Sequence, residues 1–343
     1  MKIESWRFFF PAALMLGVAG LGLWALQLGG LWGVGLQPAQ HGAFLIYGVM
    51  GTGIQGFLFT AYAKQNDAPL PGPWFLGGVG LLQVSAALSL LFGGMEGGWL
   101  WLRAAPWVAT LYWAIGVAKP ALGRRWDDTT AAVPVVLGAG LCGAVLRNND
   151  VGMHILLVPM ALAVLDRVLP FFSSKVVTGY SGRRLPWFLG VLLFLSLLKM
   201  FVPVAGLALV ALLARQVWGW QPWPAIKTPM IAVIYVGLLW IGAAWLAEGL
   251  GASRTMVLHA LGVGGMGSLF LGISMRVARG HSGLPIVLGR AGLAILMLAQ
   301  LAALLRLWAP VAGHSGLYVG SAGLLGLAFL VWLLRFVPVA ARG

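Results

Sequence analysis

The chain has 343 residues, of which 60% are hydrophobic and only 9% are charged. Soluble domains carry about 25% charged residues, so this composition excludes an ordinary soluble domain and indicates an integral membrane protein. The formal net charge of +14 does not indicate nucleic-acid binding, because the basic residues follow a topological pattern along the chain.

Apolar segments of membrane-spanning length follow one another from end to end. A hydropathy window of about 19 residues predicts twelve spans, with limits near 8–28, 43–63, 74–92, 99–118, 131–146, 151–172, 186–201, 203–218, 229–248, 255–277, 285–305 and 315–336. One crossing needs about 20 residues, so the spans use most of the chain. We therefore expect an all-α integral membrane protein, a bundle of about twelve transmembrane helices formed by one polytopic domain over residues 1–343.

The basic residues lie mainly on one side of the predicted membrane. With the N-terminus placed in the cytoplasm, sixteen of the 22 Lys and Arg residues fall on the cytoplasmic side and Arg167 falls inside the sixth span. The five on the outer side are Arg103, Arg147, Lys199, Arg254 and Arg306. This asymmetry follows the positive-inside rule. It predicts a multi-pass membrane protein with both termini in the cytoplasm.

Four of the five histidines fall at the outer end of different spans. They are His41, His154, His259 and His314, and only His281 lies on the cytoplasmic side. Ionisable side chains near or within a bilayer are costly and are rarely without function. Imidazole is well suited to bind haem iron or copper, so the pattern predicts a metal-cofactor protein with these four histidines as candidate metal ligands.

The histidine-bearing second, sixth and tenth spans are four spans apart. Three four-helix units with histidines on these helices are the arrangement of the haem–copper oxidase core subunit, which we take as an analogy of architecture alone. A complete oxidase is not expected, because the seventh span contains no histidine. The single cysteine, Cys142, is expected to be buried in the fifth span, and it excludes the paired cysteines of covalently attached haem.

The tenth span is the most informative segment. Gly262 and Gly267 follow His259 on the same helical face, and Met266 shares that face. An imidazole followed by a glycine-lined strip would give a flat porphyrin a groove against the backbone. The competing interpretation is helix packing through small residues beside an interfacial histidine.

Glycines also follow His41 in the second span. His41 and His259 could clamp one haem b, or each could hold a separate metal, with His154 as a third ligand or distal group.

The remaining candidates have both functional and structural interpretations. Arg103, Arg147 and Arg254 could pair with haem propionates or could be solvated loop residues. Asp166 and Arg167 could belong to a proton route or could form structural ion pairs, and they should point in different directions. His314 is interpreted as an outer-surface histidine, and His281 as a turn histidine beside basic residues.

Several of these segments resemble the NnrS family of bacterial membrane proteins linked to nitric oxide. The run from His259 to Pro285 resembles the family signature H-A-L-x-V-G-x-x-G-x-x-x-L-G-x-x-x-R-V-x-x-G-H-x-G-x-P. The run from Arg167 to Ser173 resembles R-V-I-P-F-F-T, and Gly56 to Ala61 matches the segment after the family's H-x-H-E-M. That last motif departs here: the chain has Ala39 and Gly42 where the family has its first His and its Glu.

The resemblance implies a twelve-span protein that binds haem, with copper as a further metal, and acts in nitric oxide metabolism or resistance. It carries over to His41, His259 and His281, with Arg167, Arg276 and Arg279 as matched basic positions. A second metal that needed the missing His and Glu would be absent.

The leading hypothesis is a haem-b protein of the bilayer that binds or reduces nitric oxide near the periplasmic face. An unidentified donor would supply electrons, and whether there is turnover is open. The alternatives are a twelve-span secondary transporter and a non-catalytic haem or copper sensor or delivery protein.

Overall fold

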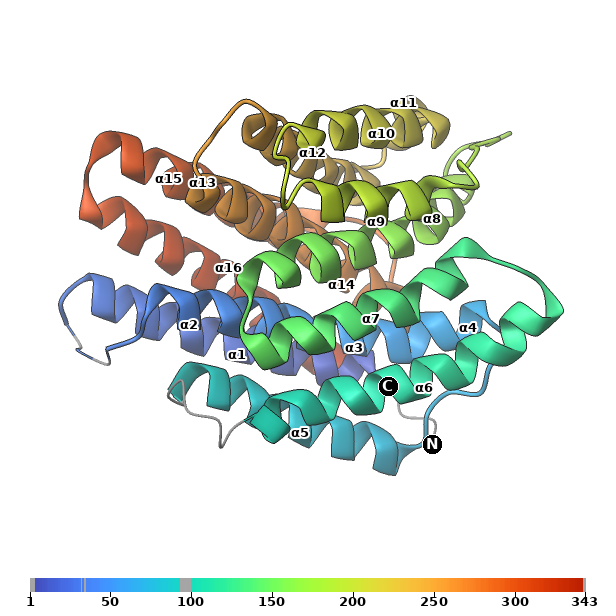
Figure 1. Cartoon of the computed structure of the whole chain (residues 1–343), viewed down its shortest axis with the longest axis horizontal. Helices are drawn as coiled ribbons and strands as arrows, with labels where there is room; N and C mark the ends of the chain where they lie inside the picture. Colours follow the sequence, from blue (N-terminus) through green and yellow to red (C-terminus); the bar gives the residue numbers. More distant parts are fainter. Residues whose placement is uncertain (1–3, 32, 34, 93–99, 342–343) are drawn as a thin grey trace.

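The computed structural model describes residues 4–31, 33, 35–92 and 100–341. Within these residues the chain forms helices and no strand, and Figure 1 shows them running side by side as a bundle. A helix satisfies its backbone N–H and C=O groups internally, which is what a water-free hydrocarbon layer requires. The predicted all-α fold is therefore confirmed.

The long helices of the described residues fall into three consecutive units of four, counting each composite helix as one. The first contains α1 (Trp6–Leu28), a composite helix at Pro38–Gln65, α5 (Pro73–Phe92) and α6 (Leu100–Arg124). The second contains α7 (Asp128–Leu146), a composite helix at Val151–Ser174, α9 (Phe188–Leu198) and α10 (Ala205–Gly219). After the short α11 (Pro222–Ala225), the third contains α12 (Pro229–Gly249), a composite helix at Arg254–His281, α15 (Gly289–Ala312) and α16 (Ser315–Ala341). The three composite helices are called span 2, span 6 and span 10 below.

A helix is present at the position of each expected span, although these helices differ in length and hydropathy. Nine of the described helices are long and apolar enough to cross a membrane. The expected fourth span corresponds to α6, which is not among the nine, and its predicted first residue, 99, lies outside the described residues. Helices α9 and α10 have 11 and 15 residues, or about 17 and 23 Å at the helical rise. Both are shorter than a hydrocarbon core of about 30 Å, because the chain turns around Pro203.

Spans 2, 6 and 10 form the centre of the bundle. Their most apolar windows are 72%, 72% and 61% buried, more than in any of the other six described candidate spans. The last helix of each unit contacts the first helix of the next, α6 with α7, α10 with α12, and α16 with α1. This closed sequence of contacts agrees with the expected arrangement in three four-helix units.

The three central spans share a backbone irregularity near their histidines. A π-helical segment follows His41 in span 2 (η1, Phe44–Met50), contains His154 in span 6 (η4, Val151–Leu157) and follows His259 in span 10 (η5, Ala260–Met266). Segment η4 packs against both η1 and η5. π-helical turns are rare and are frequent at functional sites, so these segments direct attention to one end of the bundle.

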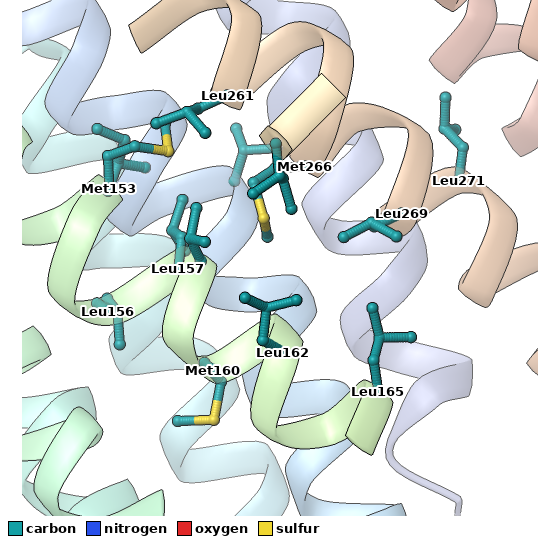
Figure 2. Packing of buried hydrophobic residues seen from close by; sticks show 14 of the residues in the cluster. Met153, Leu156, Leu157, Met160, Leu162, Leu165, Leu261, Met266, Leu269 and Leu271 are labelled. Atoms are coloured by element: carbon teal, nitrogen blue, oxygen red, sulfur yellow. The ribbon is translucent and has the colours of Figure 1, made fainter. Parts of the chain in front are cut away.

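The remaining parts of the composite spans are regular apart from a second π-helical turn. Span 2 comprises α2 (Pro38–Ala43), η1, α3 (Gly51–Phe57), η2 (Leu58–Tyr62) and α4 (Ala63–Gln65). Span 6 continues from η4 into α8 (Val158–Ser174). Span 10 comprises α13 (Arg254–His259), η5 and α14 (Gly267–His281). Leucine and methionine side chains of spans 6 and 10 fill the space between them, including Met153, Leu157, Leu261 and Met266 (Figure 2).

Both chain ends lie at the same end of the bundle. The Arg7 guanidinium donates a hydrogen bond of 2.5 Å to the carbonyl of Ala340, as an even number of crossings requires. We call this the terminal end and the opposite one, which carries His41, His154, His259 and His314, the histidine end. Lys2 and Arg342, two of the cations in the charge pattern, lie outside the described residues. The expectation that Cys142 is buried was wrong, because its side chain is exposed on α7.

Close packing between units makes one glycine a sharp test of the fold. A Cβ atom at Gly206 of α10 would lie 2.7 Å from the carbonyl oxygen of Trp245 in α12, and a backbone atom cannot move aside cheaply. We expect Gly206→Ala to lower the free energy of unfolding by about 1–3 kcal/mol, measured by thermal unfolding in detergent. Gly138→Ala on α7 is the control, because nothing lies within 4 Å of its Cβ. Equal effects of the two substitutions would contradict the packing described.

Candidate functional site: a histidine-lined cavity

The histidine end contains a cavity of about 800 Å³ between the three central spans. His41 of span 2 and His259 of span 10 both line it, with Trp24, Met153 and Phe329 among the apolar walls. The loop before span 6 and the histidine-end part of α15 complete the lining. The structure therefore brings together the two histidines that the sequence paired.

His41 is positioned by the turn that enters span 2. The Gln27 side chain accepts a hydrogen bond from the N–H of Leu36 at 2.7 Å and donates one to its carbonyl at 2.8 Å. Helix α2 then begins at Pro38, a residue whose fixed φ suits a first helical position, with Gln37 and Gln40 forming a capping box. The His41 ring stacks on Trp24 with 4.4 Å between centroids and 14° between planes. Trp24 thus fixes the plane of the imidazole and leaves the ring edges available.

His259 is held through its other nitrogen. Helix α13 is capped by the Ser253 hydroxyl, which accepts from the N–H of Met256. One turn further on, Nδ1 of His259 lies 2.7 Å from the carbonyl oxygen of Thr255. Since a carbonyl only accepts, Nδ1 carries the proton and Nε2 keeps its lone pair. This is the tautomer and orientation that metal-binding histidines usually have.

Three arginines line the cavity. Arg306 of α15 interacts electrostatically with both imidazoles, lies 4.7 Å above the Tyr318 ring and forms no ion pair within the described residues. Arg147 donates to the carbonyl of Leu90 at 3.2 Å. Arg254 makes a two-point ion pair with Asp150, whose carboxylate oxygens lie 2.8 and 2.9 Å from Nε. The cavity therefore combines two imidazoles with cations, one of which has no carboxylate partner.

Hydrogen bonds between spans hold the mouth of the cavity. The Tyr47 hydroxyl of span 2 donates to the carbonyl of Asn148, and the Asn149 amide donates to the carbonyl of Ala39 at 3.2 Å. The Arg254–Asp150 pair connects the start of span 10 to the start of span 6. These contacts fix the three central spans relative to one another where the cavity opens.

Two of the predicted histidine ligands lie elsewhere. His154 is buried in η4, its Nδ1 has no hydrogen-bond partner, and it does not line the cavity. It interacts electrostatically with Lys199, which forms a buried ion pair with Glu248 at 2.7 Å. His314 is exposed and accepts a hydrogen bond from the N–H of Gly316, as the surface interpretation predicted. The expected set of four histidines is thus a pair at the cavity and two separate side chains.

The predicted glycine strip is only partly present. Gly262 lines the cavity, but Gly267 does not, and Met266 instead lines a separate apolar pocket between spans 2, 6 and 10. The expectation assumed 3.6 residues per turn, whereas residues 260–266 form π-helical turns that hydrogen-bond five residues apart. The wider turn rotates the residues after it away from the face of His259.

One predicted cation, Arg103, lies outside the cavity, and several residues of the cavity lining were not predicted. Arg103 is buried and donates to the carbonyl of Ser89, but it is not part of the cavity lining. Trp24, Asp150 and Arg306 line the cavity and were not predicted. An arginine near the end of an apolar span is costly, so of these three residues Arg306 was the one that the sequence could have indicated as a candidate site residue.

At the terminal end, the matched basic residues lie far from this cavity. Arg167 forms an ion pair with Asp127, while Asp166 pairs with Arg184 at 3.3 Å and accepts from Gln216 at 2.7 Å. Asp166 and Arg167 therefore point to different partners, as expected.

The other three matched residues follow at the end of span 10. Nδ1 of His281 contacts the Glu4 carboxylate at 2.6 Å, Arg279 donates to the Pro285 carbonyl at 2.9 Å, and Arg276 packs 3.7 Å above the Phe172 ring.

The fold and this cavity define a multi-pass, all-α membrane protein with a histidine pair between its central helices. A family model described as NnrS protein matches residues 4–342, and the chain belongs to that family. Membership makes it a membrane protein related to nitric oxide. A comparison with curated proteins finds no match.

The departure from the family motif lies in the cavity wall. Ala39 and Gly42, which replace the family's His and Glu, both line the cavity. Throughout the described residues, no three His, Cys, Asp or Glu side chains come together as a metal-binding group. The histidines that line this site are consequently one pair, His41 and His259.

The buried pair beside His154 should matter more for stability than the exposed pair at the mouth. Lys199 and Glu248 have side chains 1% and 18% exposed, so Lys199→Met leaves a carboxylate with its partner removed and should cost about 3–5 kcal/mol. The double variant Lys199→Met/Glu248→Met should recover most of this loss. Arg254→Gln at the exposed pair should cost about 1 kcal/mol or less. Thermal unfolding of the four proteins checks the ranking, and a double variant as unstable as the single one would contradict it.

Proposed function

We propose that this protein binds haem b in the histidine-end cavity and binds nitric oxide there. His41 and His259 would hold the haem, and Arg306 would pair with a propionate. The observation that carries the proposal is the placement of two imidazoles, one with its Nδ1 already hydrogen-bonded, on one largely apolar cavity.

The residues at this site suit the group in size and chemistry. Cofactor sites usually have volumes of about 300–1,000 Å³, and the cavity has about 800 Å³. Gly262 keeps the wall after His259 open, since a Cβ there would meet only the Met153 methyl group, at 3.3 Å. Arg306 offers a guanidinium that has no carboxylate partner among the described residues, which suits a propionate.

Copper does not fit this cavity equally well. A copper centre needs several nitrogen, sulfur or carboxylate ligands at one point, and two positions where the family supplies such groups are Ala39 and Gly42 here. The proposal for this chain is therefore haem alone.

The role of the protein residues follows from their contacts. Binding of nitric oxide would require that only one of these two imidazoles holds the iron in the gas-binding form, because ligation by both would favour electron transfer instead. The Thr255 carbonyl fixes the tautomer of His259, while Trp24 sets the plane of His41 by stacking. Asp150 is held by its ion pair with Arg254, and electrons for a reduction would come from an external donor.

The first test is the optical spectrum of detergent-purified, haem-replete protein. We expect a b-type reduced-minus-oxidised spectrum in the wild type, and its loss or conversion to high spin in His41→Ala and His259→Ala. His314→Ala is the matched control, because that side chain is exposed in a loop and its removal should change nothing. A wild-type protein without a Soret band would end the haem proposal and favour the transporter alternative.

The assignment of Arg306 can be tested separately from the axial ligands. A hydrogen bond to a charged group contributes about 1.5–3 kcal/mol, so Arg306→Gln should weaken haem binding about tenfold or more while the spectrum keeps its shape. Arg290→Gln, at the other end of the same helix and exposed, should leave the affinity unchanged. If haem titrations gave equal affinities for the wild type and both variants, the assignment of Arg306 to the haem site would be wrong.

Turnover distinguishes an enzyme from a sensor or delivery protein. If the protein reduces nitric oxide, an artificial electron donor should sustain nitric oxide consumption over many equivalents per haem, and His259→Ala should abolish it. Consumption that stops at one equivalent would assign binding without catalysis. The measurement is steady-state consumption at a nitric oxide electrode.

A further inference from the structure

A second cavity, of about 820 Å³, lies at the terminal end, some 33 Å from the first as judged by the helical rise between His259 and His281. It is bounded by the start of α1 and by the terminal-end parts of spans 2, 6 and 10. Its apolar walls include Phe10, Phe57, Phe172 and Val277. Nothing in the proposed function uses this cavity.

The polar lining of the second cavity is basic. Lys64, Arg167, Lys175 and Arg276 line it together with His281, and no carboxylate is among the described residues of the lining. Two neighbouring carboxylates pair with part of this set, Asp127 with Arg167 and Glu4 with Lys64 and His281.

Glu4 is charged at neutral pH. Partial burial alone would raise the pKa of Glu4, but hydrogen bonds from Trp6 and His281, with the charges of His281 and Lys64, leave it below its usual value. Arg276 and Lys175 have no ion-pair partner within the described residues, so the cavity keeps an excess of positive charge.

Arg276 is the least expected of these cations. It is only 6% exposed, and its Nε has no hydrogen-bond partner. A buried guanidinium without a counter-charge is costly, and the face of the Phe172 ring 3.7 Å away compensates only part of that cost. Lys175 lies 5.3 Å from the adjacent Phe171 ring. Phe171 and Phe172, which are consecutive in the chain, thus each lie against a cation that has no ion pair within the described residues.

The cavity opens at the side of the bundle. Phe171 and Ile286, which line it, are 57% and 40% exposed, so large apolar side chains face outward where acyl chains would surround the protein. A ligand that entered here would need an apolar body for the aromatic walls and an anionic group for Arg276 and Lys175. Basic pockets between transmembrane helices on the cytoplasmic side bind the head groups of acidic lipids, and the positive-inside pattern places this end in the cytoplasm.

We propose that this cavity binds an acidic phospholipid of the adjacent leaflet, with its phosphate against Arg276 and Lys175 and an acyl chain against the aromatic wall. The lipid would supply the counter-charge that the buried Arg276 lacks. It would also join α1 to the ends of spans 2, 6 and 10, which line the cavity together.

The test uses the full-length protein in a neutral detergent. Phosphatidylglycerol should raise the unfolding temperature saturably and remain bound in native mass spectrometry, whereas phosphatidylcholine with the same acyl chains and inorganic phosphate should do neither. Arg276→Gln should weaken phosphatidylglycerol binding about tenfold, as the loss of one hydrogen bond to a charged group implies. Arg215→Gln makes the same change at an exposed arginine of α10 and should bind like the wild type.

A second variant keeps the proposal testable if Arg276→Gln does not fold. Lys175→Gln removes an exposed charge of the same pair and should also weaken phosphatidylglycerol binding. Equal stabilisation by phosphatidylcholine, an equal loss in Arg215→Gln, or full competition by inorganic phosphate would overturn the lipid assignment. If Arg276→Gln and Lys175→Gln each bound one haem fewer than the wild type, the ligand of this cavity would be a porphyrin and the lipid assignment would be wrong. Neither lipid readout depends on haem at the histidine end.

Discussion

The close approach of spans 2, 6 and 10 at the histidine end is the constraint on which the site depends. These helices are enclosed by the others, so polar groups between them have mainly one another as partners. Tyr47 and Asn149 connect span 2 to the loop before span 6, and Asp150 connects that loop to Arg254 of span 10. Because the helices are fixed in this way, the space between their π-helical turns remains open as a cavity with His41 and His259 on its wall.

The sequence predicted the helices well, because length and hydropathy determine them, whereas the central position of spans 2, 6 and 10 appears only in the burial of the structure. It also placed His41 and His259 at one end, since topology requires only an even number of crossings between them. It could not predict the fate of Gly267 and Met266, because a π-helical turn leaves no distinct hydropathy signal and rotates every later side chain. Nor could it predict that Lys199 would be buried, because its partner Glu248 lies 49 residues away on α12.

The composition of the cavity wall narrows the chemistry of the site. In place of the His and Glu of the family motif, this chain has Ala39 and Gly42, side chains with no donor atoms. A cavity with two imidazoles and both apolar and basic walls has the residue types that would hold a haem, whereas a centre with several ligands at one point lacks its donors within the described residues. The same substitutions enlarge the cavity at its mouth, where a small neutral gas would enter. The departure from the motif therefore affects which metal-binding side chains line the cavity more than it affects the arrangement of the helices around the cavity.

An apolar pocket lies between the two cavities of the bundle. The space between the cavities is a pocket of only about 60 Å³, lined by residues such as Met50, Phe57 and Met266 without one polar side chain. A neutral gas can dissolve in such surroundings, but a chain of water molecules needs polar partners. Protons consumed in a reduction of nitric oxide would therefore find no polar side chain on the described lining of this pocket. The charged residues of the terminal end form ion pairs of their own, which agrees with a separate ligand at that end.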